Sequence, residues 1–492
     1  MKEPNGLTRR QFLVRAGCAS LGSTGVLSAL LNLGMAAKMA ASDLNDYKAM
    51  VCVFLLGGND SYNVLAPANR DEYRYYLDSR GGLYDVENNP AGLALAAPGE
   101  MPGSLLPIQP VNLPGRGFGI HPAMPDIKRL FDAKALSFVA NVGSLQKPLP
   151  NVAAYRNASG DRPLGLFSHS DQQQQWQTCM PDRRSGIGWA GRAMDILQND
   201  QSAGQKSTFN ISLSGTNILQ TGSQVVPYSM SLDGLVPLKG YALSEPSANA
   251  SFNEKETYAR SAAVKKMMDG MYRNLFETTY ARITLDAQDA LTQYQKKLDT
   301  DAYPQWDTAN QPVLEQQLKL VANVISAYRN SPTKRQTFFI SISGFDLHHG
   351  LMLEHPDVLK ALNSALGNFW NHLSADLKPA VTLFTASDFG RTLSGNGSGA
   401  DHGWGGNQIV MGGAVQGGRI FGTYPTFAPS VIETTYDVGQ GRLIPGFSVE
   451  EYVYPILRWF GVSDSDLFGA VFPGYTSRFG SGGIRASYPL YG

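Results

Sequence analysis

Three apolar stretches of this sequence each end in an aspartate, and histidines follow two of them. VCVFLLGGND ends at Asp60, TFFISISGFDLHH contains Asp346 and His348, and FTASDFGRTLSGNGSGADHGWGGN runs through Asp388 to His402. Carboxylates and imidazoles bind divalent metals and transfer protons during ester hydrolysis. Aspartate also caps turns after strands, but three such endings with nearby histidines favour one converging site.

A fourth segment, FSHSD at residues 167–171, precedes a helical pattern that starts near Gln172. A hydroxyl of Ser168 or Ser170 at this junction would lie beside backbone N–H groups and the positive end of a helix. That environment suits an anion or an attacking hydroxyl. Serine is also a common helix N-cap, so capping is the alternative role for Ser168. His169 adjoins it and could act as a ligand, as a base, or in neither role.

These side chains could meet only if the elements before them end at one edge of a sheet. Short apolar runs at residues 50–56, 337–343 and 381–385 predict buried strands. Another strand, predicted at 135–142, follows a helix that starts near His121. The alternation of strands and helices predicts an α/β fold with a doubly wound, mostly parallel sheet and helices on both faces. Ligands of such sheets bind at the carboxyl ends of the strands, where the aspartates are expected.

The amino-terminal segment resembles a twin-arginine export signal. Arg9 and Arg10 precede an apolar stretch at 16–35, and small residues crowd 36–42. We therefore expect residues 1–42 to be removed and the protein to be exported folded, to the periplasm or the medium. Glycine, serine and asparagine interrupt the apolar stretch, so no stable membrane span is expected after the signal is removed.

The composition limits which partners and which domain organisation are expected. The 41 basic residues match the 41 acidic ones, so no net charge favours nucleic acid as a partner. Three cysteines cannot build a disulfide framework, and 52 glycines with 28 prolines indicate many turns and long loops. We expect one α/β domain over 43–492, with an irregular excursion at 67–120 and a helical insertion around 254–300.

Eight segments together resemble DUF1501, a family of uncharacterised exported bacterial proteins. The family is similar in fold to the alkaline phosphatase and sulfatase superfamily, whose enzymes hold one or two divalent metals at strand ends. The segments occur in order and span nearly the whole mature chain: TRRQF, VFLLGGNDSYN, HPAMPDIKRLF, FSHSDQQQQWQT, SGFDLHHG, SDFGRT, DHGWGGNQIVMGGAVQGGRIFG and LRWFGV.

The resemblance implies roles for individual residues. Ser168 fits the nucleophile position, His169 adjoins it as a ligand or base, and Arg391 could present a planar fork to a tetrahedral anion. Mixed aspartate and histidine ligands favour zinc or manganese over magnesium. The implied metal ligands are Asp60, Asp346, His348, Asp388 and His402.

The sequence also departs from the superfamily pattern. Phe389 stands where its phosphatases usually have a histidine, so one metal or none fits the ligand count better than two. His349 is the alternative metal ligand if His348 is not the one. Cys179 matches the C-x-P-x-R pattern of sulfatases, but it follows a predicted helix instead of opening one, which favours a chance match. The other histidines are assigned structural roles: His121, His355 and His372.

Two functions follow from these patterns. The first is an exported metal-dependent hydrolase of phosphate or sulfate esters, acting on a small-molecule or polymer substrate. The alternative is an exported, non-catalytic binding or assembly protein that keeps the fold with a degenerate site. Bound divalent metal in roughly stoichiometric amount would favour the hydrolase.

Overall fold

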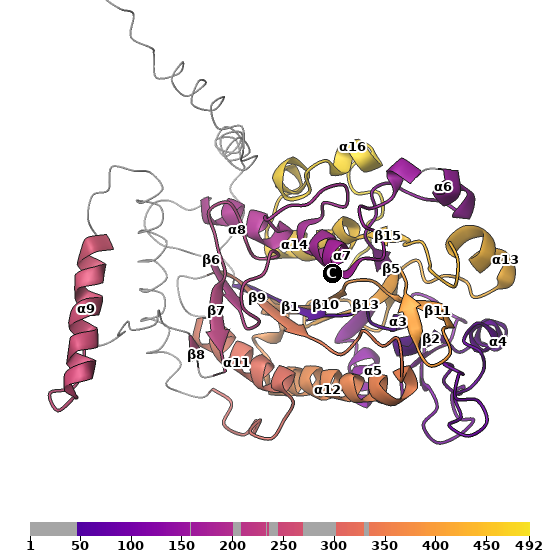
Figure 1. Ribbon diagram of the computed structural model, residues 1–492, viewed down its shortest axis with the longest axis horizontal. Coiled ribbons are helices and arrows are strands. Elements are labelled where there is room, and N and C mark those ends of the chain that lie inside the picture. Colours follow the sequence, from indigo (N-terminus) through magenta and orange to yellow (C-terminus); the bar gives the residue numbers. More distant parts are fainter. Residues whose placement is uncertain are drawn as a thin grey trace, which may run out of the picture.

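One mixed sheet forms the centre of the computed structural model (Figure 1). β1 (Lys48–Leu55) lies between β9 (Arg335–Ile342) and β10 (Val381–Ser387), and both pairings are parallel. The strand order is β14-β5-β13-β10-β1-β9-β6-β7-β8, with β15 also paired to β5. The residues described are 47–157, 159–199, 208–232, 234–235, 245–268, 302–328 and 334–492.

The predicted mostly parallel α/β fold is confirmed, with antiparallel exceptions at β13 and between β7 and β8. β13 (Gly406–Gly412) runs antiparallel to both β10 and β5 (Leu136–Gly143), because the chain between β10 and β13 has no crossover helix that would return it to the start of β10. The parallel pairings of β1, β9 and β10 are unaffected. The remaining strands of the sheet are β6 (Thr208–Ser212), β7 (Tyr228–Ser231), β8 (Gly234–Leu235), β14 (Ile420–Gly422) and β15 (Phe447–Ser448).

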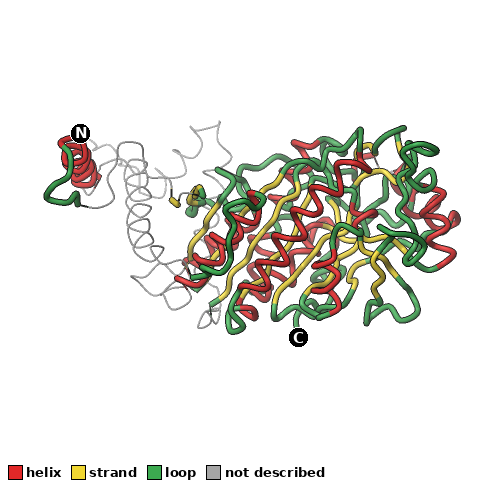
Figure 2. The backbone as a smooth tube through the Cα atoms, turned by 90° about the horizontal axis from the view of Figure 1, so that it is seen from below, coloured by secondary structure: helices red, strands yellow, loops and turns green. Residues whose placement is uncertain are grey.

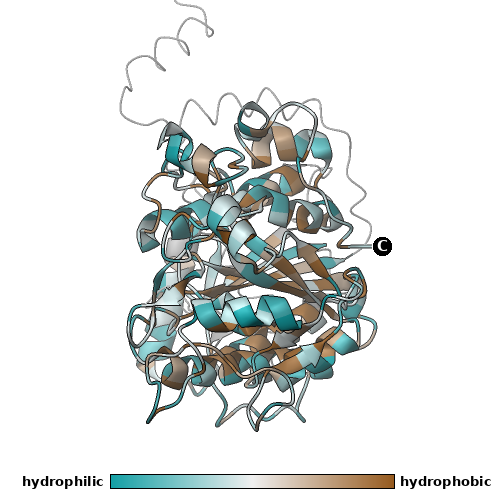
Figure 3. Ribbon diagram, turned by 90° about the vertical axis from the view of Figure 1, so that its right-hand side faces the viewer, coloured by the Kyte–Doolittle hydropathy of each residue, from teal (hydrophilic) through white to brown (hydrophobic). Residues whose placement is uncertain are grey.

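Helices cover both faces of the sheet, as Figures 1 and 2 show. Successive side chains of β1 point to opposite faces, so Val51 and Val53 join one hydrophobic core while Cys52 and Phe54 join the other. In Figure 3 the sheet carries mainly hydrophobic residues and the outer helix surfaces mainly hydrophilic ones. The first core includes α5 (Pro125–Asp132), α11 (Val313–Tyr328) and α12 (Leu351–His372), and the second α7 (His169–Thr178), α8 (Trp189–Asn199) and α14 (Val449–Phe460).

Two segments differ from the sequence-based expectation. The sequence predicts the start of this helix at His355 or Pro356, but α12 starts at Leu351, because the N–H groups of Leu353 and Glu354 already bond to the carbonyl of Gly350. The excursion at 67–120 contains α4 (Arg70–Ser79) and two of the three strands of a small antiparallel sheet, whose third strand, β2, ends at Pro67. These strands are only three residues long, too short for an alternating pattern to be recognised: β2 (Leu65–Pro67), β3 (Leu106–Ile108) and β4 (Phe118–Ile120).

Two predicted segments lie wholly or partly outside the described residues. The signal peptide at 1–42 is one of them. α9 (Phe252–Met268) covers the first part of the insertion expected around 254–300, and residues 269–300 lie outside the described ranges. Among the helices of the described ranges, none has the length and apolar character needed to cross a membrane. The other short helices are α3 (Ser61–Val64), α6 (Val152–Asn157), α13 (Pro429–Val431), α15 (Asp464–Asp466) and α16 (Tyr475–Phe479).

Two of the histidines that were assigned structural roles are buried together. The ring centroids of His121 and His355 lie 5.7 Å apart. His355 Nε2 is 3.0 Å from the side-chain oxygen of Asn59, and His121 Nδ1 accepts a bond from the Ala123 N–H at 3.0 Å. Burial lowers the pKa of each imidazole to about 3, so both are neutral in the folded protein at pH 7.

We expect the stability of the protein to decrease as the pH falls below about 6.5, the ordinary pKa of histidine. Below this pH the histidines of the unfolded chain bind protons, whereas buried His121 and His355 of the folded protein stay neutral until the pH approaches about 3. Each histidine therefore lowers the free energy of unfolding by up to about 1.4 kcal/mol per pH unit in this window. Denaturant unfolding of chelator-treated protein at several pH values would measure the slope. His355→Gln should flatten it, and an equal slope in both proteins would contradict this expectation.

Candidate metal centre

The loops after β1, β9 and β10 meet at one edge of the sheet. Asp60, Asp346 and Asp388 follow these strands in turn. Gly57 has φ +113°, and a Cβ atom there would lie 2.4 Å from the backbone nitrogen of Asp346, so only glycine allows the loops after β1 and β9 to approach this closely. The edge predicted to carry the site is therefore formed by tightly packed loops.

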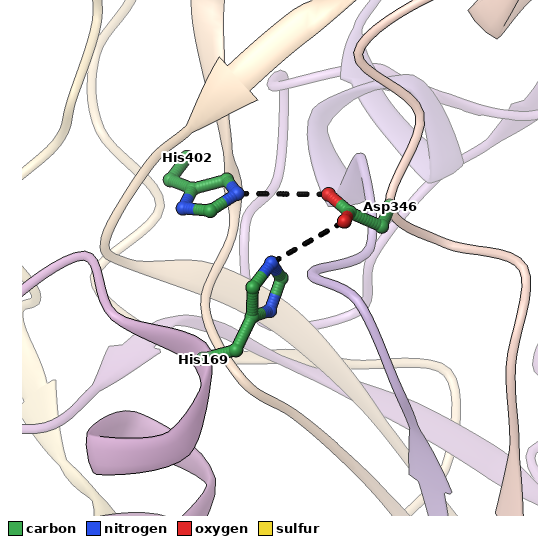
Figure 4. A group of neighbouring side chains, drawn as sticks. All are labelled: His169, Asp346 and His402. Carbon is green, nitrogen blue, oxygen red and sulfur yellow. Dashed lines mark ion pairs between the residues drawn. The ribbon is translucent and has the colours of Figure 1, made fainter.

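A hairpin returns a histidine to this edge. β11 (Arg391–Gly395) and β12 (Ala400–His402) are antiparallel, and Arg391 pairs with His402 in their register. From the opposite side, α7 begins at His169. Segments more than 200 residues apart in the chain thus supply the two imidazoles that face Asp346 (Figure 4).

Three side chains, those of His169, Asp346 and His402, form a compact cluster that we call the His–Asp group. One ligand atom from each lies within 4.8 Å of the other two. His169 Nε2 is 3.4 Å from Asp346 Oδ2, and His402 Nε2 is 3.6 Å from Asp346 Oδ1. The structure therefore brings together two of the predicted metal residues and the histidine whose role the sequence left open.

Hydrogen bonds orient both imidazoles. His402 Nδ1 lies 2.8 Å from the carbonyl oxygen of Phe167, and because a carbonyl only accepts, this nitrogen carries the proton. His169 Nδ1 bonds in the same way to Asp388 Oδ2 at 2.6 Å. Each Nε2 is left with a lone pair, and His169 Nε2 is buried with no hydrogen-bond partner among the described residues. Two lone pairs beside a carboxylate are a donor set for a cation.

His348 lies next to this group, with its ring more exposed. Its Nε2 is 2.9 Å from His402 Nε2 and 3.2 Å from Asp346 Oδ1. Its Nδ1 is 3.2 Å from Asp401 Oδ1, so a second carboxylate orients this ring. The side chains of His348 and Asp346 are 37% and 50% exposed, which leaves the centre open to solvent on their side.

The pKa values of the group suit cation binding. Partial burial is the largest single effect and would raise the pKa of the Asp346 carboxyl. The hydrogen bond and charge of Arg391, together with the neighbouring imidazoles of His169 and His348, lower the pKa overall. The hydrogen bond from the Asn396 amide lowers the pKa of Asp401. Burial lowers the pKa of His402, which keeps its imidazole neutral. Near neutral pH the carboxylates are therefore charged and the His402 imidazole is neutral.

Arg391 is buried and connects the loops after β1 and β9 with β12 through hydrogen bonds. Its buried guanidinium donates to the carbonyl oxygens of Gly58 at 2.9 Å, Phe345 at 3.1 Å and Ala400 at 2.9 Å. It also forms an ion pair with Asp346. These contacts give Arg391 a role in positioning Asp346, in place of the fork for an anion that the resemblance implies.

Two predicted ligands make other contacts. Asp60 is buried and forms an ion pair with Arg80, whose side chain is also fully buried, so the chain itself supplies the opposing charge. Asp388 Oδ2 accepts bonds from His169 and from the Gln173 amide at 2.8 Å. Neither aspartate therefore faces the proposed cation. Asp60 is paired with Arg80, and Asp388 orients the imidazole of His169.

Ser168 is the N-cap residue of α7, but its side chain makes no capping bond. Its hydroxyl lies 3.2 Å from that of Ser170. The preceding residue, Phe167, has φ +73°, a conformation that is uncommon for a residue with a side chain. This turn directs the Phe167 carbonyl to His402, a contact that no pattern in the sequence indicates. Asp401 was detectable only as a carboxylate adjacent to His402.

Phe389 fills the space beside the two ligand imidazoles. Its ring centroid lies 4.8 Å from that of His169 and 4.5 Å from that of His402. Gly58 leaves room for it, because a Cβ there would be 2.5 Å from the Phe389 ring. Because the phenyl ring of Phe389 has no atom that can bind a metal, the centre fits one cation better than two.

The two remaining candidates lie apart from the group. His349 Nδ1 is 3.2 Å from the hydroxyl of Ser398 and is exposed. Cys179 is buried at the end of α7, and burial raises the pKa of its thiol well above the ordinary value. A buried neutral thiol is a poor candidate for the modified cysteine of sulfatases.

Comparison with known protein families identifies the family of this chain. Residues 47–440 match the family described as "Protein of unknown function (DUF1501)". No curated protein matches the chain. The matched range includes all the side chains of the His–Asp group and the carboxylates that orient them.

Proposed function

Because the chain belongs to the DUF1501 family, whose function is unknown, we propose its activity from the geometry of the candidate metal centre. We propose that His169, Asp346 and His402 bind one divalent cation and that the protein hydrolyses a phosphate or sulfate ester outside the cytoplasm. One observation carries the proposal: two imidazoles are oriented through Nδ1 so that both Nε2 lone pairs face one carboxylate.

The residues suit a catalytic cation better than a structural one. Two nitrogens and one carboxylate oxygen are a donor set that favours zinc or manganese over magnesium. Structural zinc sites are closed by four protein ligands, whereas catalytic sites keep a position open. Here Asp346 is half exposed, and three side chains form the group, which leaves space for water and an ester.

His348 is placed to move a proton. A cation at the centre would polarise the ester oxygen and lower the pKa of a water molecule. His348 Nε2, beside both Asp346 and His402, would take the proton of the attacking water, and Asp401 would stabilise the charged ring. As the oxygen–phosphorus or oxygen–sulfur bond to water forms and the bond to the leaving alcohol breaks, His348 returns the proton to the leaving oxygen.

Ser168 remains the alternative nucleophile, because it directly precedes the ligand His169. If water attacks, zinc-loaded Ser168→Ala should hydrolyse p-nitrophenyl phosphate and p-nitrophenyl sulfate within a few-fold of the parent. If Ser168 attacks, the rate should fall about 10³-fold or more while bound zinc is unchanged. Initial rates with both esters decide between these outcomes, and Ser170→Ala is the matched control because its hydroxyl lies 3.2 Å from that of Ser168.

A non-catalytic binding or assembly role is the second candidate. Phe389 packed against both imidazoles and Asp60 paired with Arg80 favour it, since both features remove ligands that a two-metal centre would use. A metal-loaded protein that hydrolyses neither ester would support this role. Export remains a proposal from the sequence, supported by Arg9 and Arg10 before an apolar stretch, and cell fractionation would test it.

A further inference from the structure

A tight turn outside the metal centre presents Arg442 to it. The Asp437 carboxylate accepts bonds from the N–H groups of Gly439 at 2.7 Å and Gly441 at 2.8 Å, which close the turn. The Gly441 carbonyl in turn accepts a bond from Leu393 of β11 at 3.1 Å. The backbone that carries Arg442 is therefore fixed to the hairpin that delivers a ligand histidine.

Arg442 contacts His402 in two ways. Its Nε donates to the carbonyl oxygen of His402 at 2.9 Å. Its guanidinium also lies over the ring of Phe167, 5.2 Å from the centroid, and the Phe167 carbonyl accepts the bond from His402 Nδ1. One side chain thus holds the backbone of His402 directly and the direction of its ring through Phe167.

Phe167 depends on such contacts to stay in place. Its φ of +73° lies in the left-handed region, which is unfavourable for a residue with a side chain, so neighbouring groups must hold it there. Trp404 packs edge-on against one part of the Phe167 ring, at 6.4 Å between centroids, and Arg442 adds its guanidinium. Loss of the guanidinium would free the turn that aims the carbonyl at His402.

We propose that Arg442 is a positioning residue that sets the affinity and coordination geometry of the metal centre without touching the cation. The inference rests on the proposed function, because it assumes that His402 Nε2 is a ligand. Groups that orient a ligand histidine typically change metal affinity by about 10- to 100-fold when they are lost.

Zinc affinity, measured by competition with a chromophoric chelator, tests this role. Arg442→Met keeps much of the stem but removes the charge and the donors, and it should bind zinc about 10- to 100-fold more weakly than the parent. Arg162→Met is the matched control, because Arg162 also bonds to a carbonyl, that of Tyr155, and lies over the ring of Tyr155 at 3.9 Å. The control should bind zinc within about threefold of the parent, since the hydrogen bonds and ring contact of Arg162 go to Tyr155 and not to His402 or Phe167.

Cobalt absorption spectra separate positioning from loss of structure. The d–d bands of cobalt-loaded Arg442→Met should shift relative to the parent, whereas those of Arg162→Met should not. Arg442→Lys, which keeps the charge but not the planar fork, should also bind zinc more weakly, and it serves as the test if Arg442→Met does not fold.

Each result decides a different point. Parent-like zinc affinity and cobalt bands in folded Arg442→Met, or in Arg442→Lys if only that variant folds, would overturn the role of Arg442 and leave the metal centre intact. Zinc affinity equal to that of the parent in Arg442→Lys would overturn the role of the planar guanidinium, because the positive charge alone would then be sufficient. If the parent itself bound no zinc, the metal centre would be refuted, and this inference with it.

Discussion

Replacing His169 or His402 with alanine should remove the bound metal and reduce ester hydrolysis to background. Each change deletes one of the two nitrogen ligands, so metal affinity should fall by more than the roughly 100-fold typical of groups that only orient a ligand. The His169 variant is the clearer test, because His348 Nε2 lies 2.9 Å from His402 Nε2 and could move toward a vacated position. Metal content after gel filtration and initial rates are the measurements.

The matched control for these variants is His349→Ala. His349 adjoins His348 in sequence, but its imidazole bonds to the Ser398 hydroxyl and lies outside the group. Its replacement should leave metal content and rate unchanged. Full metal content in folded His169→Ala would show that this histidine is not a ligand, and the assignment would fail.

Replacing His348 with alanine should separate metal binding from catalysis. We expect bound metal to remain near the parent level, because His169, Asp346 and His402 are intact, while kcat falls about 10²- to 10⁴-fold through loss of the proton-transfer group. Asp401→Asn keeps the His348 ring but removes the charge that orients it, so its kcat should fall less. Metal analysis of the same samples used for the rates would make the comparison direct.

The opposite result for His348 has a definite meaning. If His348→Ala lost its metal together with its activity, His348 would be a ligand, as was expected from the sequence. Its distance of 3.2 Å from Asp346 Oδ1 makes this outcome sterically accessible. The proton-transfer role would then be withdrawn, and Asp401 would be a group that orients a ligand.

The elements around the site were predictable because each is locally encoded. Strands β1, β9 and β10 are short apolar runs, so their positions and the aspartates after them followed from the sequence alone. The antiparallel direction of β13 was not predictable, because it depends on where the hairpin before it places the chain. Very short strands such as β2 carry too few residues to show a period.

The roles of individual site residues were less predictable, because they depend on partners distant in the chain. Asp60 looked like a ligand until its pairing with Arg80 was known, and Asp388 looked like one until His169 was seen to donate to it. The oxygen that orients His402 is a backbone carbonyl, that of Phe167, and any residue type supplies such an oxygen. Sequence could therefore indicate the edge of the sheet but not which carboxylates face the cation.

Metal content of the parent protein tests the central claim most directly. Purified protein would be stripped with a chelator, equilibrated with zinc, freed of excess metal and analysed for zinc per chain. The group of His169, Asp346 and His402 predicts one tightly bound zinc per chain, lost again on chelation. A folded parent that retains no zinc or manganese after this procedure would contradict the proposed metal centre.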